Sequence, residues 1–341
     1  MHHFDSDYME GAHPQVLQRL IETNLEQTSG YGTDPYCQSA KEKIRAACDC
    51  PKAQVYFLVG GTQTNSTVIK SLLRPYQGVI AADTAHINVF EAGTVEAGGH
   101  KILTLPNHDG KISAEQVAEY LDAFQSAGEH SHVVHPGMVY ISHPSELGTL
   151  YTRQELEELS KVCRSHKLPL FLDGARLGYG LVAKDTDVTL KTIAQYCDVF
   201  YIGGTKVGAL FGEAVVITTP GLIEHFSTMM KQQGGLLAKG RLLGVQFDAL
   251  FTEKLYLKAA EQGVAMAQKL RQAFVDKGYA VYSESPTNQQ FIILPNQKKA
   301  ELEKHVSFEV WKKIDKNYTA VRFVTSWATQ EEDIDHLIEL L

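Results

Sequence analysis

Short apolar segments alternate with longer stretches of helical pattern between about residues 55 and 232, and this alternation constrains the fold more than any other feature. It is typical of an α/β protein, because parallel strands are connected by helical crossovers. We therefore expect an α/β fold with a mostly parallel, seven-stranded sheet. The predicted strands are residues 55–59, 79–82, 101–105, 138–142, 168–172, 198–202 and 213–218.

Two helix starts within this region can be predicted from polar residues. Ser113 with Gln116, and Thr152 with Glu155, have the spacing of capping boxes, in which the two side chains satisfy each other's backbone donors. Each pair stands before a helical pattern, so each predicts the first turn of a crossover helix.

The pattern changes after about residue 235, where a long, mostly helical stretch leads into short strands and a terminal helix. A chain of 341 residues also exceeds the size that one hydrophobic core usually serves. We expect residues 1–245 to hold an N-terminal segment and a large α/β domain, and residues 246–341 a small α+β domain. The strands predicted there are 280–283, 290–294 and 320–326, followed by a helix over 331–341.

Net charge, the length of apolar runs and the cysteine pattern restrict the expected partners and location of the protein. The net charge of -8 and the pI near 6.0 disfavour nucleic acid and anionic membranes as partners, because the long-range field repels phosphate. No apolar run reaches the roughly 20 residues of a spanning helix, and MHHFDSDYMEG lacks the features of a signal peptide. The cysteines are odd in number and scattered, which fits reduced thiols and a cytoplasmic location. They are Cys37, Cys48, Cys50, Cys163 and Cys197.

Ligands of open parallel sheets bind beyond the carboxyl ends of the strands, so polar residues that follow strands are the functional candidates. Gly60-Gly61-Thr62 follows a strand and precedes a helical pattern, which predicts a phosphate cup of backbone N–H groups. The alternative is a plain turn capped by Thr62. Asp173 follows the apolar segment LPLFL and is either a buried functional carboxylate or a structural partner of Arg176.

Lys206 and His86 follow two other predicted strands. Lys206 has few polar neighbours, so it is either a desolvated amine that can attack a carbonyl group or an ordinary surface lysine. The ring of His86 either stacks on a flat ligand or simply packs. Taken together, the cup, carboxylate, ring and amine match pyridoxal 5'-phosphate: Asp173 would keep the pyridine nitrogen protonated, and Lys206 would hold the aldehyde as a Schiff base.

Several longer segments carry a resemblance to a known family: FDSDYMEGAHPQVL, GYGTDPY, GGTQTN, HINVFEAG, DGARL, GGTKVGALFGE, GRLLG and VRFVTSW. Over nearly its whole length the sequence resembles the threonine aldolases, of the β-eliminating lyase group of fold-type I pyridoxal phosphate enzymes. The resemblance implies a homo-oligomer, dimer or tetramer, with active sites shared between subunits.

The resemblance also implies roles for individual residues. The catalytic candidates are Lys206, Asp173, His86 and His143. The candidates for cofactor binding are Gly61, Thr62, His86, Asp173, Arg176, Thr205, Lys206 and Arg241. The candidates for substrate binding are Ser6, Tyr31, Arg176 and Arg322. No metal site is expected, because the histidines of HSHVVH have no partnering carboxylate or cysteine pattern.

The sequence departs from the family after the fourth predicted strand. Where threonine aldolases read E-N-T-H-N, this chain reads ISHPSELGT, so Ser145 stands in place of a histidine and His143 lies two residues earlier. The proton-accepting base is therefore left open between His86 and His143.

The function expected from the sequence is a low-specificity L-threonine or allo-threonine aldolase that releases glycine and an aldehyde. Other pyridoxal phosphate chemistry, namely β-elimination, racemisation or transamination, stays open because the cofactor-binding residues do not distinguish these reactions. A binding protein for a phosphorylated metabolite is a third reading, but it gives no role to Asp173 and Lys206.

Overall fold

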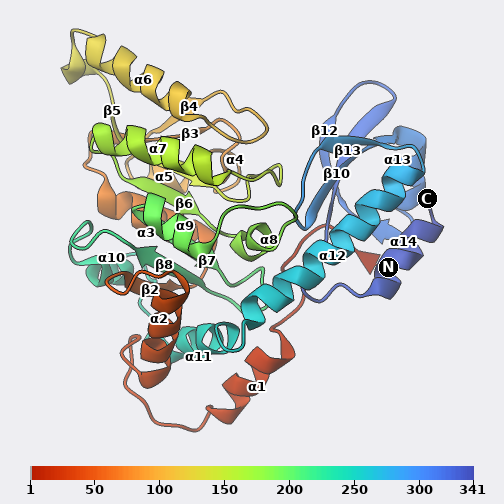
Figure 1. The fold of residues 1–341 in the computed structure, drawn as a ribbon, viewed down its shortest axis with the longest axis horizontal. Coiled ribbons are helices and arrows are strands. Elements are labelled where there is room, and N and C mark those ends of the chain that lie inside the picture. The colour runs from red at the N-terminus through yellow and green to blue at the C-terminus, as the bar shows by residue number, and fades with distance from the viewer. Residues whose placement is uncertain (1) are drawn as a thin grey trace.

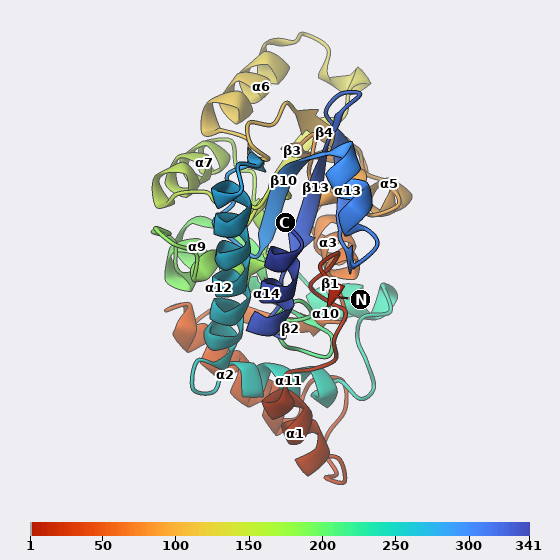
Figure 2. The ribbon, with the colours of Figure 1, turned by 90° about the vertical axis from the view of Figure 1, so that its right-hand side faces the viewer.

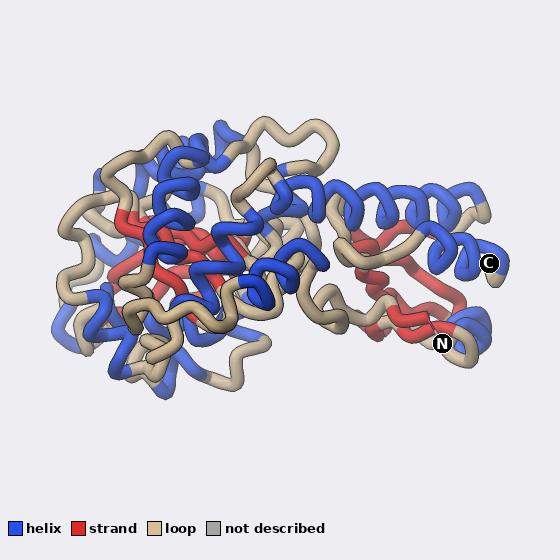
Figure 3. The backbone as a smooth tube through the Cα atoms, turned by 90° about the horizontal axis from the view of Figure 1, so that it is seen from below, coloured by secondary structure: helices blue, strands red, loops and turns tan. Residues whose placement is uncertain are grey.

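The computed structural model describes residues 2–341, which form a large α/β unit and a smaller unit around a second sheet (Figure 1). Helix α12 (Leu255–Asp276) runs from the large unit along the small one. The two sheets lie at opposite ends of the molecule (Figure 3). None of the helices in residues 2–341 has both the length and the apolar character of a membrane-spanning segment.

The large sheet has seven strands in the order β2-β8-β7-β6-β5-β3-β4. The neighbours from β7 to β4 are parallel, whereas β8 is antiparallel to both β2 and β7. The predicted fold class is confirmed, since each strand overlaps a predicted segment. The strands are β2 (Gln54–Leu58), β3 (Gln77–Ala82), β4 (Ile102–Leu105), β5 (His135–Ser142), β6 (Leu170–Asp173), β7 (Val199–Gly203) and β8 (Glu213–Ile217).

The central strands β6, β7 and β8 are buried along their whole length. Helices cover both faces of such a sheet, which explains why these strands are continuous apolar runs rather than alternating ones. Gly174 follows β6 where β7 passes closest: a Cβ atom there would lie 2.0 Å from the carbonyl oxygen of Tyr201. Only glycine fits this approach of two backbones.

Two helices of the large unit begin at capping boxes. Both predicted capping boxes are present, Ser113 with Gln116 before α6 and Thr152 with Glu155 before α7. The helices are α1 (Pro14–Glu22), α2 (Pro35–Ala47), α3 (Gly61–Leu72), α4 (His86–Val89), α5 (Thr94–Ala97), α6 (Ala114–Ser126), α7 (Arg153–Ser165), α8 (Leu177–Leu181), α9 (Leu190–Tyr196), α10 (Phe226–Gln232) and α11 (Arg241–Leu250), with a 3-10 turn, η1, at His130–His132.

The small unit has an antiparallel sheet in the order β12-β13-β10-β9. Its elements are β9 (Ala280–Ser283), β10 (Gln289–Pro295), α13 (Asn296–Leu302), β12 (Glu309–Lys313), β13 (Tyr318–Val324) and α14 (Glu331–Glu339). The three predicted strands and the terminal helix are confirmed. Strand β12 is missing from the sequence prediction because EVWKK is an edge strand with exposed or half-buried side chains and no apolar run.

The N-terminal strand belongs to the small unit. Strand β1 (His2–His3) pairs in parallel with β11 (Val306–Ser307), and Phe4 packs in the same core as Phe274 and Phe323. Both ends of the chain therefore lie on this unit (Figure 2). Helix α11 is continuous across residue 245, and the division of the chain at residues 245 and 246 stays a prediction.

Candidate active site

Four of the candidate residues meet at one edge of the large sheet. Strands β3, β6 and β7 run in one direction, and β2 shares it because the intervening β8 is antiparallel to both β2 and β7. The residues that follow these strands therefore gather at their common carboxyl edge. They are Gly61, His86, Asp173 and Lys206.

Asp173 is buried at this edge and accepts hydrogen bonds on both carboxylate oxygens. Tyr201 donates to Oδ1 at 2.5 Å, and Tyr140 and the amide of Asn65 donate to Oδ2 at 2.6 and 2.9 Å. Burial acts to raise the pKa of Asp173, but the nearby His86 and the tyrosine hydroxyls hold it below its usual value. Asp173 is thus an anion inside the protein.

The amine of Lys206 is buried close to the charged side chains of Arg176, Asp7 and Asp173. Burial and the positive charge of Arg176 lower the pKa of Lys206 to about 8, although Asp7 and Asp173 act in the opposite direction. The Nζ atom lies 5.8 Å from the centre of the Tyr8 ring. The lowered pKa increases the neutral, nucleophilic fraction of this amine near neutral pH.

The loop between β7 and β8 holds Lys206 in place. The Thr205 hydroxyl donates to Glu213 Oε1 at 2.8 Å and accepts the Gly212 N–H at 3.0 Å. Glu213 also accepts the Gly204 N–H at 3.0 Å, and burial raises its pKa to about 8. Thr205 therefore orders the loop that carries Lys206, and its predicted part in cofactor binding stays a prediction.

The N-terminus of α3 forms a cradle with no side-chain cap. Its N-cap residue is Gly60, and a Cβ atom on Gly61 would lie 3.2 Å from the Tyr201 hydroxyl. Thr62 is exposed, and Thr64 Oγ1 is buried without a hydrogen-bond partner in residues 2–341. Free N–H groups, the positive end of the helix dipole and an unpartnered hydroxyl suit an anionic group.

His86 begins α4 beside Asp173. Its Nδ1 lies 2.8 Å from Oε1 of Glu91, whose side chain is fully buried. The carboxylate can only accept, so Nδ1 carries the proton and Nε2 is left free. The amide of Asn65 donates to the same Glu91 oxygen at 2.8 Å and to Asp173, so it ties the histidine to the central carboxylate.

A further carboxyl group, Glu146, lies in the loop after β5. Its Oε1 accepts hydrogen bonds from the Ser142 hydroxyl at 2.6 Å and from the His86 N–H at 2.8 Å. Ser145, which stands where the family has a histidine, bonds instead to Thr149 at 2.6 Å. Ser145 thus stabilises this loop through a hydrogen bond within it.

The backbone of His143 lies beside Asp173, whose carbonyl oxygen accepts the His143 N–H at 2.9 Å, but the ring of His143 lies on the side of Tyr151. It is fully buried, its Nδ1 accepts the Tyr151 N–H at 3.3 Å, and its Nε2 has no partner within residues 2–341. Burial, with a smaller effect from Lys111, lowers its pKa to about 4. The ring contacts the segment before α7, and the predicted catalytic role of His143 stays a prediction.

Arg176 and Asp7 form a buried ion pair across the site. The Arg176 side chain donates to both oxygens of Asp7, at 2.7 and 3.0 Å, and Asn288 of the small unit donates to Asp7 at 2.9 Å. Asp7 is fully buried, so this bidentate pair replaces the water that each ion loses.

Ser6 and Arg322 retain unused polar atoms. Ser6 Oγ and Arg322 Nε are buried without a hydrogen-bond partner within residues 2–341. Arg322 is held by Gln289 at 2.8 Å, by an ion pair with Glu309 and by the ring of Trp311. Burial and the charge of Arg176 lower its pKa. The two arginines thus lie close enough for their charges to interact, and Ser6 directly precedes Asp7, the partner of Arg176.

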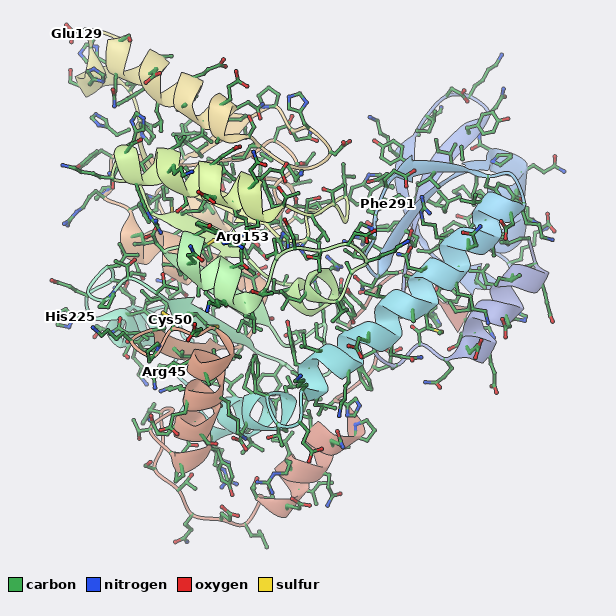
Figure 4. All side chains as sticks on the ribbon, viewed as in Figure 1. Arg45, Cys50, Glu129, Arg153, His225 and Phe291 are labelled. Carbon is green, nitrogen blue, oxygen red and sulfur yellow. The ribbon has the colours of Figure 1, made fainter. Side chains whose placement is uncertain are left out.

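Aromatic rings from the two units lie near one another beside Arg322. Trp311 lies 5.0 Å, ring to ring, from Phe291, which Figure 4 labels on the side of the small unit that faces the large one. Trp311 also lies 6.3 Å from Phe90 of the large unit. The rings border the site from the side of the small unit.

Tyr31 and Arg241 lie away from this group in the single chain. Tyr31 is half exposed and its ring lies 4.7 Å from Lys231. Arg241 donates to the carbonyl oxygens of Thr23, Asn24 and Glu26, and so holds the segment after α1. Their predicted roles in binding substrate and cofactor stay predictions.

Sequence reasoning missed several buried residues of the site: Asp7, Asn65, Glu91, Tyr140, Glu146, Tyr201 and Glu213. The acidic ones had a usable signal, since each stands next to a candidate motif, as Glu91 does in HINVFEAG. The tyrosines had none, because a hydroxyl inside an apolar strand looks like ordinary core.

Comparison with known proteins agrees with this geometry. The profile of the family described as Beta-eliminating lyase matches residues 3–297. The low specificity L-threonine aldolase of Pseudomonas sp. (strain NCIMB 10558) is 28% identical over 339 residues, which cover 98% of this chain and 95% of that protein. The low specificity L-threonine aldolase of Escherichia coli (strain K12) is 27% identical over 255 residues, 72% of each chain.

Solved structures are similar over the full length. The threonine aldolase of Leishmania major has a TM-score of 0.96 and 38% identity, over 100% of this chain and 98% of that one. A double mutant of Thermus thermophilus aspartate aminotransferase has a TM-score of 0.71 over 99% of this chain and 90% of that one. Its identity is 13%, so this second likeness concerns the fold alone.

Proposed function

The chain belongs to the β-eliminating lyase family, among its threonine aldolases, and from this premise we propose that it is a low-specificity L-threonine aldolase. It is a pyridoxal phosphate-dependent carbon–carbon lyase with the fold-type I architecture. The proposed reaction cleaves L-threonine or L-allo-threonine to glycine and acetaldehyde.

The observation that carries the proposal is the pair of Lys206 and Asp173 at one sheet edge. The lysine has a pKa lowered to about 8, and the aspartate is a buried anion held by tyrosine and amide donors. A non-catalytic phosphate-binding protein would need neither group. The residues therefore fit the cofactor, and the uncapped start of α3 fits its phosphate.

Each part of the cofactor has a residue to hold it. Lys206 would attach it covalently through the ε-amine, and Asp173 would pair with its protonated pyridine nitrogen. His86 would lie against the ring, and the backbone around Gly61 and Thr62 would receive the phosphate. When bound, the cofactor supplies an electron sink for the bond that breaks at Cα of the amino acid.

The substrate carboxylate would bind beside Arg322 and Ser6. Arg322 Nε and Ser6 Oγ lack partners within residues 2–341, so a carboxylate can use both without breaking a protein hydrogen bond. Arg176 is already paired with Asp7 through two of its nitrogens, so it adds mainly positive charge. Fixing the carboxylate in this way orients the Cα–Cβ bond.

A homo-oligomer would bring further residues to the site. Tyr31 is half exposed, and α1 and the segment after it expose the apolar side chains of Leu17, Ile21 and Leu25. An apolar face on an exposed helix supports a subunit contact there. We expect a dimer or tetramer, which sedimentation equilibrium would measure.

The direct experiment replaces the lysine and compares products. Lys206→Ala should lose the borohydride-sensitive absorbance of the attached cofactor and the cleavage of threonine. A variant that keeps this absorbance would contradict the assignment of Lys206. For the wild-type enzyme, threonine, allo-threonine, serine and alanine are supplied separately, and glycine, aldehyde, pyruvate and keto acids are assayed. Pyruvate from serine with no aldehyde from any substrate would favour β-elimination and overturn the aldolase proposal.

A further inference from the structure

Glu146 is a carboxyl group in the site to which neither the family resemblance nor the roles above give a part. It lies in the loop 143–149, which joins β5 to the segment before α7. Its Oε1 is fixed by two donors, the Ser142 hydroxyl and the His86 N–H. No other residue within 2–341 donates to Oε2, and this oxygen is not one of the buried atoms that lack a partner. One oxygen is therefore anchored, and the other has no donor within residues 2–341 and is not completely shielded from solvent.

Hydrogen bonds connect Glu146 to Asp173 through His86, and a longer contact approaches Asp173 from the other side. On one side, Ser142 lies 3.5 Å from the Tyr140 hydroxyl, which donates to Asp173. On the other side, His86 leads through Glu91 and Asn65 back to Asp173. The residues connected in this way are Asp173, Tyr140, Ser142, Glu146, His86, Glu91 and Asn65.

The loop that carries Glu146 is fixed from both units. The Ser145 hydroxyl bonds to Thr149, and Ser283 of β9 donates to the Leu147 carbonyl oxygen at 2.9 Å. A Cβ atom on Gly148 would lie 2.2 Å from Ser285 Oγ, so the loop packs tightly against the small unit. A side chain on such a support keeps its position without help from substrate.

Charged and titratable groups face Glu146 from each neighbouring element. These are Asp173 from β6, Tyr140 from β5, His86 and Glu91 from the segment after β3, and Tyr151 at the end of its own loop. Burial raises the pKa of Glu146, and the negative charge of Asp173 adds to this effect. The hydrogen bonds from Ser142 and from backbone N–H groups oppose it in part. A base whose pKa is moved toward neutrality exchanges protons efficiently at working pH.

We infer that Glu146 is the catalytic base that removes the β-hydroxyl proton of the substrate, through Oε2. This inference rests on the proposed aldolase function. The O–H bond breaks, its proton bonds to Oε2, and its electrons form the aldehyde carbonyl as the Cα–Cβ bond breaks. The electron pair of that bond stays with the glycine fragment and is protonated at Cα, so there is no net oxidation.

The histidines are less suited to this step. His143 is buried against the segment before α7, and His86 Nδ1 is held by Glu91. His86 retains Nε2, but its ring would lie against the cofactor, and the proposal assigns it to holding the cofactor. Glu146 is anchored beside His86 and has a free oxygen.

The test compares Glu146→Gln with Glu158→Gln, a matched change on the exposed face of α7. In the holoenzyme, kcat/KM for threonine cleavage should fall by about 10² to 10⁴ in Glu146→Gln only. Cofactor absorbance, glycine affinity and exchange of the glycine α-proton with solvent deuterium should be retained, because none of them needs a base at the β-hydroxyl. Cleavage within a few-fold of the control, or loss of cofactor absorbance, would overturn the inference.

A second variant tests the same group through its pKa. Ser142→Ala removes a donor that stabilises the Glu146 carboxylate, so the acid limb of kcat/KM for threonine should move to higher pH. An unmoved limb counts against Glu146. A wild-type enzyme that carries the cofactor but releases no glycine from threonine would refute the aldolase function itself, which is a separate outcome.

A third measurement follows the stability of the holoenzyme as pH changes. Because the folded pKa of Glu146 is raised, its contribution to stability is present at low pH and is lost as pH rises through that pKa. Thermal unfolding should therefore show a decline in stability over this range that is smaller in Glu146→Gln. Equal pH dependence in the two proteins would contradict a raised pKa and with it the proposed base.

Discussion

The lowered pKa of Lys206 predicts how fast the protein without cofactor binds pyridoxal phosphate covalently. Only the neutral amine attacks the aldehyde. Burial and the charge of Arg176 lower the pKa from its ordinary value of 10.5 to about 8. The rate of attachment should therefore depend on pH with an inflection near 8, well below that of an exposed lysine.

The size of the effect follows from the two pKa values. At pH 7, a pKa of about 8 leaves roughly 9% of the amine neutral, whereas the ordinary value leaves roughly 0.03%. Lys206 should therefore react about 300-fold faster at pH 7 than a solvated lysine of equal access. Stopped-flow absorbance measures the rate. As a reference, the rate at which butylamine reacts with pyridoxal phosphate is measured in the same buffers. Dividing this rate by the neutral fraction of butylamine gives the correction for titration of the cofactor.

Replacing Arg176 isolates the electrostatic part of this shift. Arg176→Gln removes a nearby positive charge and leaves Asp7 to stabilise the ammonium form, so the inflection should rise by about one pH unit. The control is Arg153→Gln, a change at an exposed arginine on the first turn of α7 that Figure 4 labels. An inflection near 10 in the wild type, or the same inflection in both variants, would refute the reasoning.

Two further predictions concern stability. His143 is buried with its pKa lowered to about 4, so its contribution to stability is present above its unfolded pKa of 6.5 and is lost as pH falls through about 4. Urea unfolding should show a loss of up to about 3 kcal/mol over this range, and His143→Gln should flatten it while retaining threonine cleavage. Gly174→Ala places a Cβ atom 2.0 Å from the Tyr201 carbonyl oxygen, whereas Gly128→Ala meets nothing within 4 Å. The first change should lower the unfolding free energy by about 3 kcal/mol or more and the second by little; equal unfolding curves would disprove the close approach.

The strands and their end residues could be predicted because their signals are local. A buried strand such as β7 is an apolar run, and the residue that follows it, Lys206 in one case, is placed by the parallel topology. The helix caps at Ser113 and Thr152 are equally local. A few adjacent residues suffice to predict each of these features.

The partners inside the site could not be predicted, because they come from distant parts of the chain. Asn65 and Asp173 are 108 residues apart, and Asp7 and Arg176 are 169 residues apart. Only the folded arrangement brings such groups together. The direction of the His143 ring could not be predicted for the same reason. Its position two residues before Ser145 does not determine where the ring points, and in the structure the ring packs near Tyr151.

Because β1 pairs with β11, we expect the side of the site that carries Ser6 and Arg322 to form last during synthesis. Ser6 and Asp7 are made before the large sheet, but the strand before them has no partner until Val306 and Ser307 are made. Arg322 follows later still. The large sheet can fold, with Lys206 and Asp173 in place, while the carboxylate-binding side is still open. A nascent or C-terminally truncated chain should therefore attach cofactor before it can hold an amino acid.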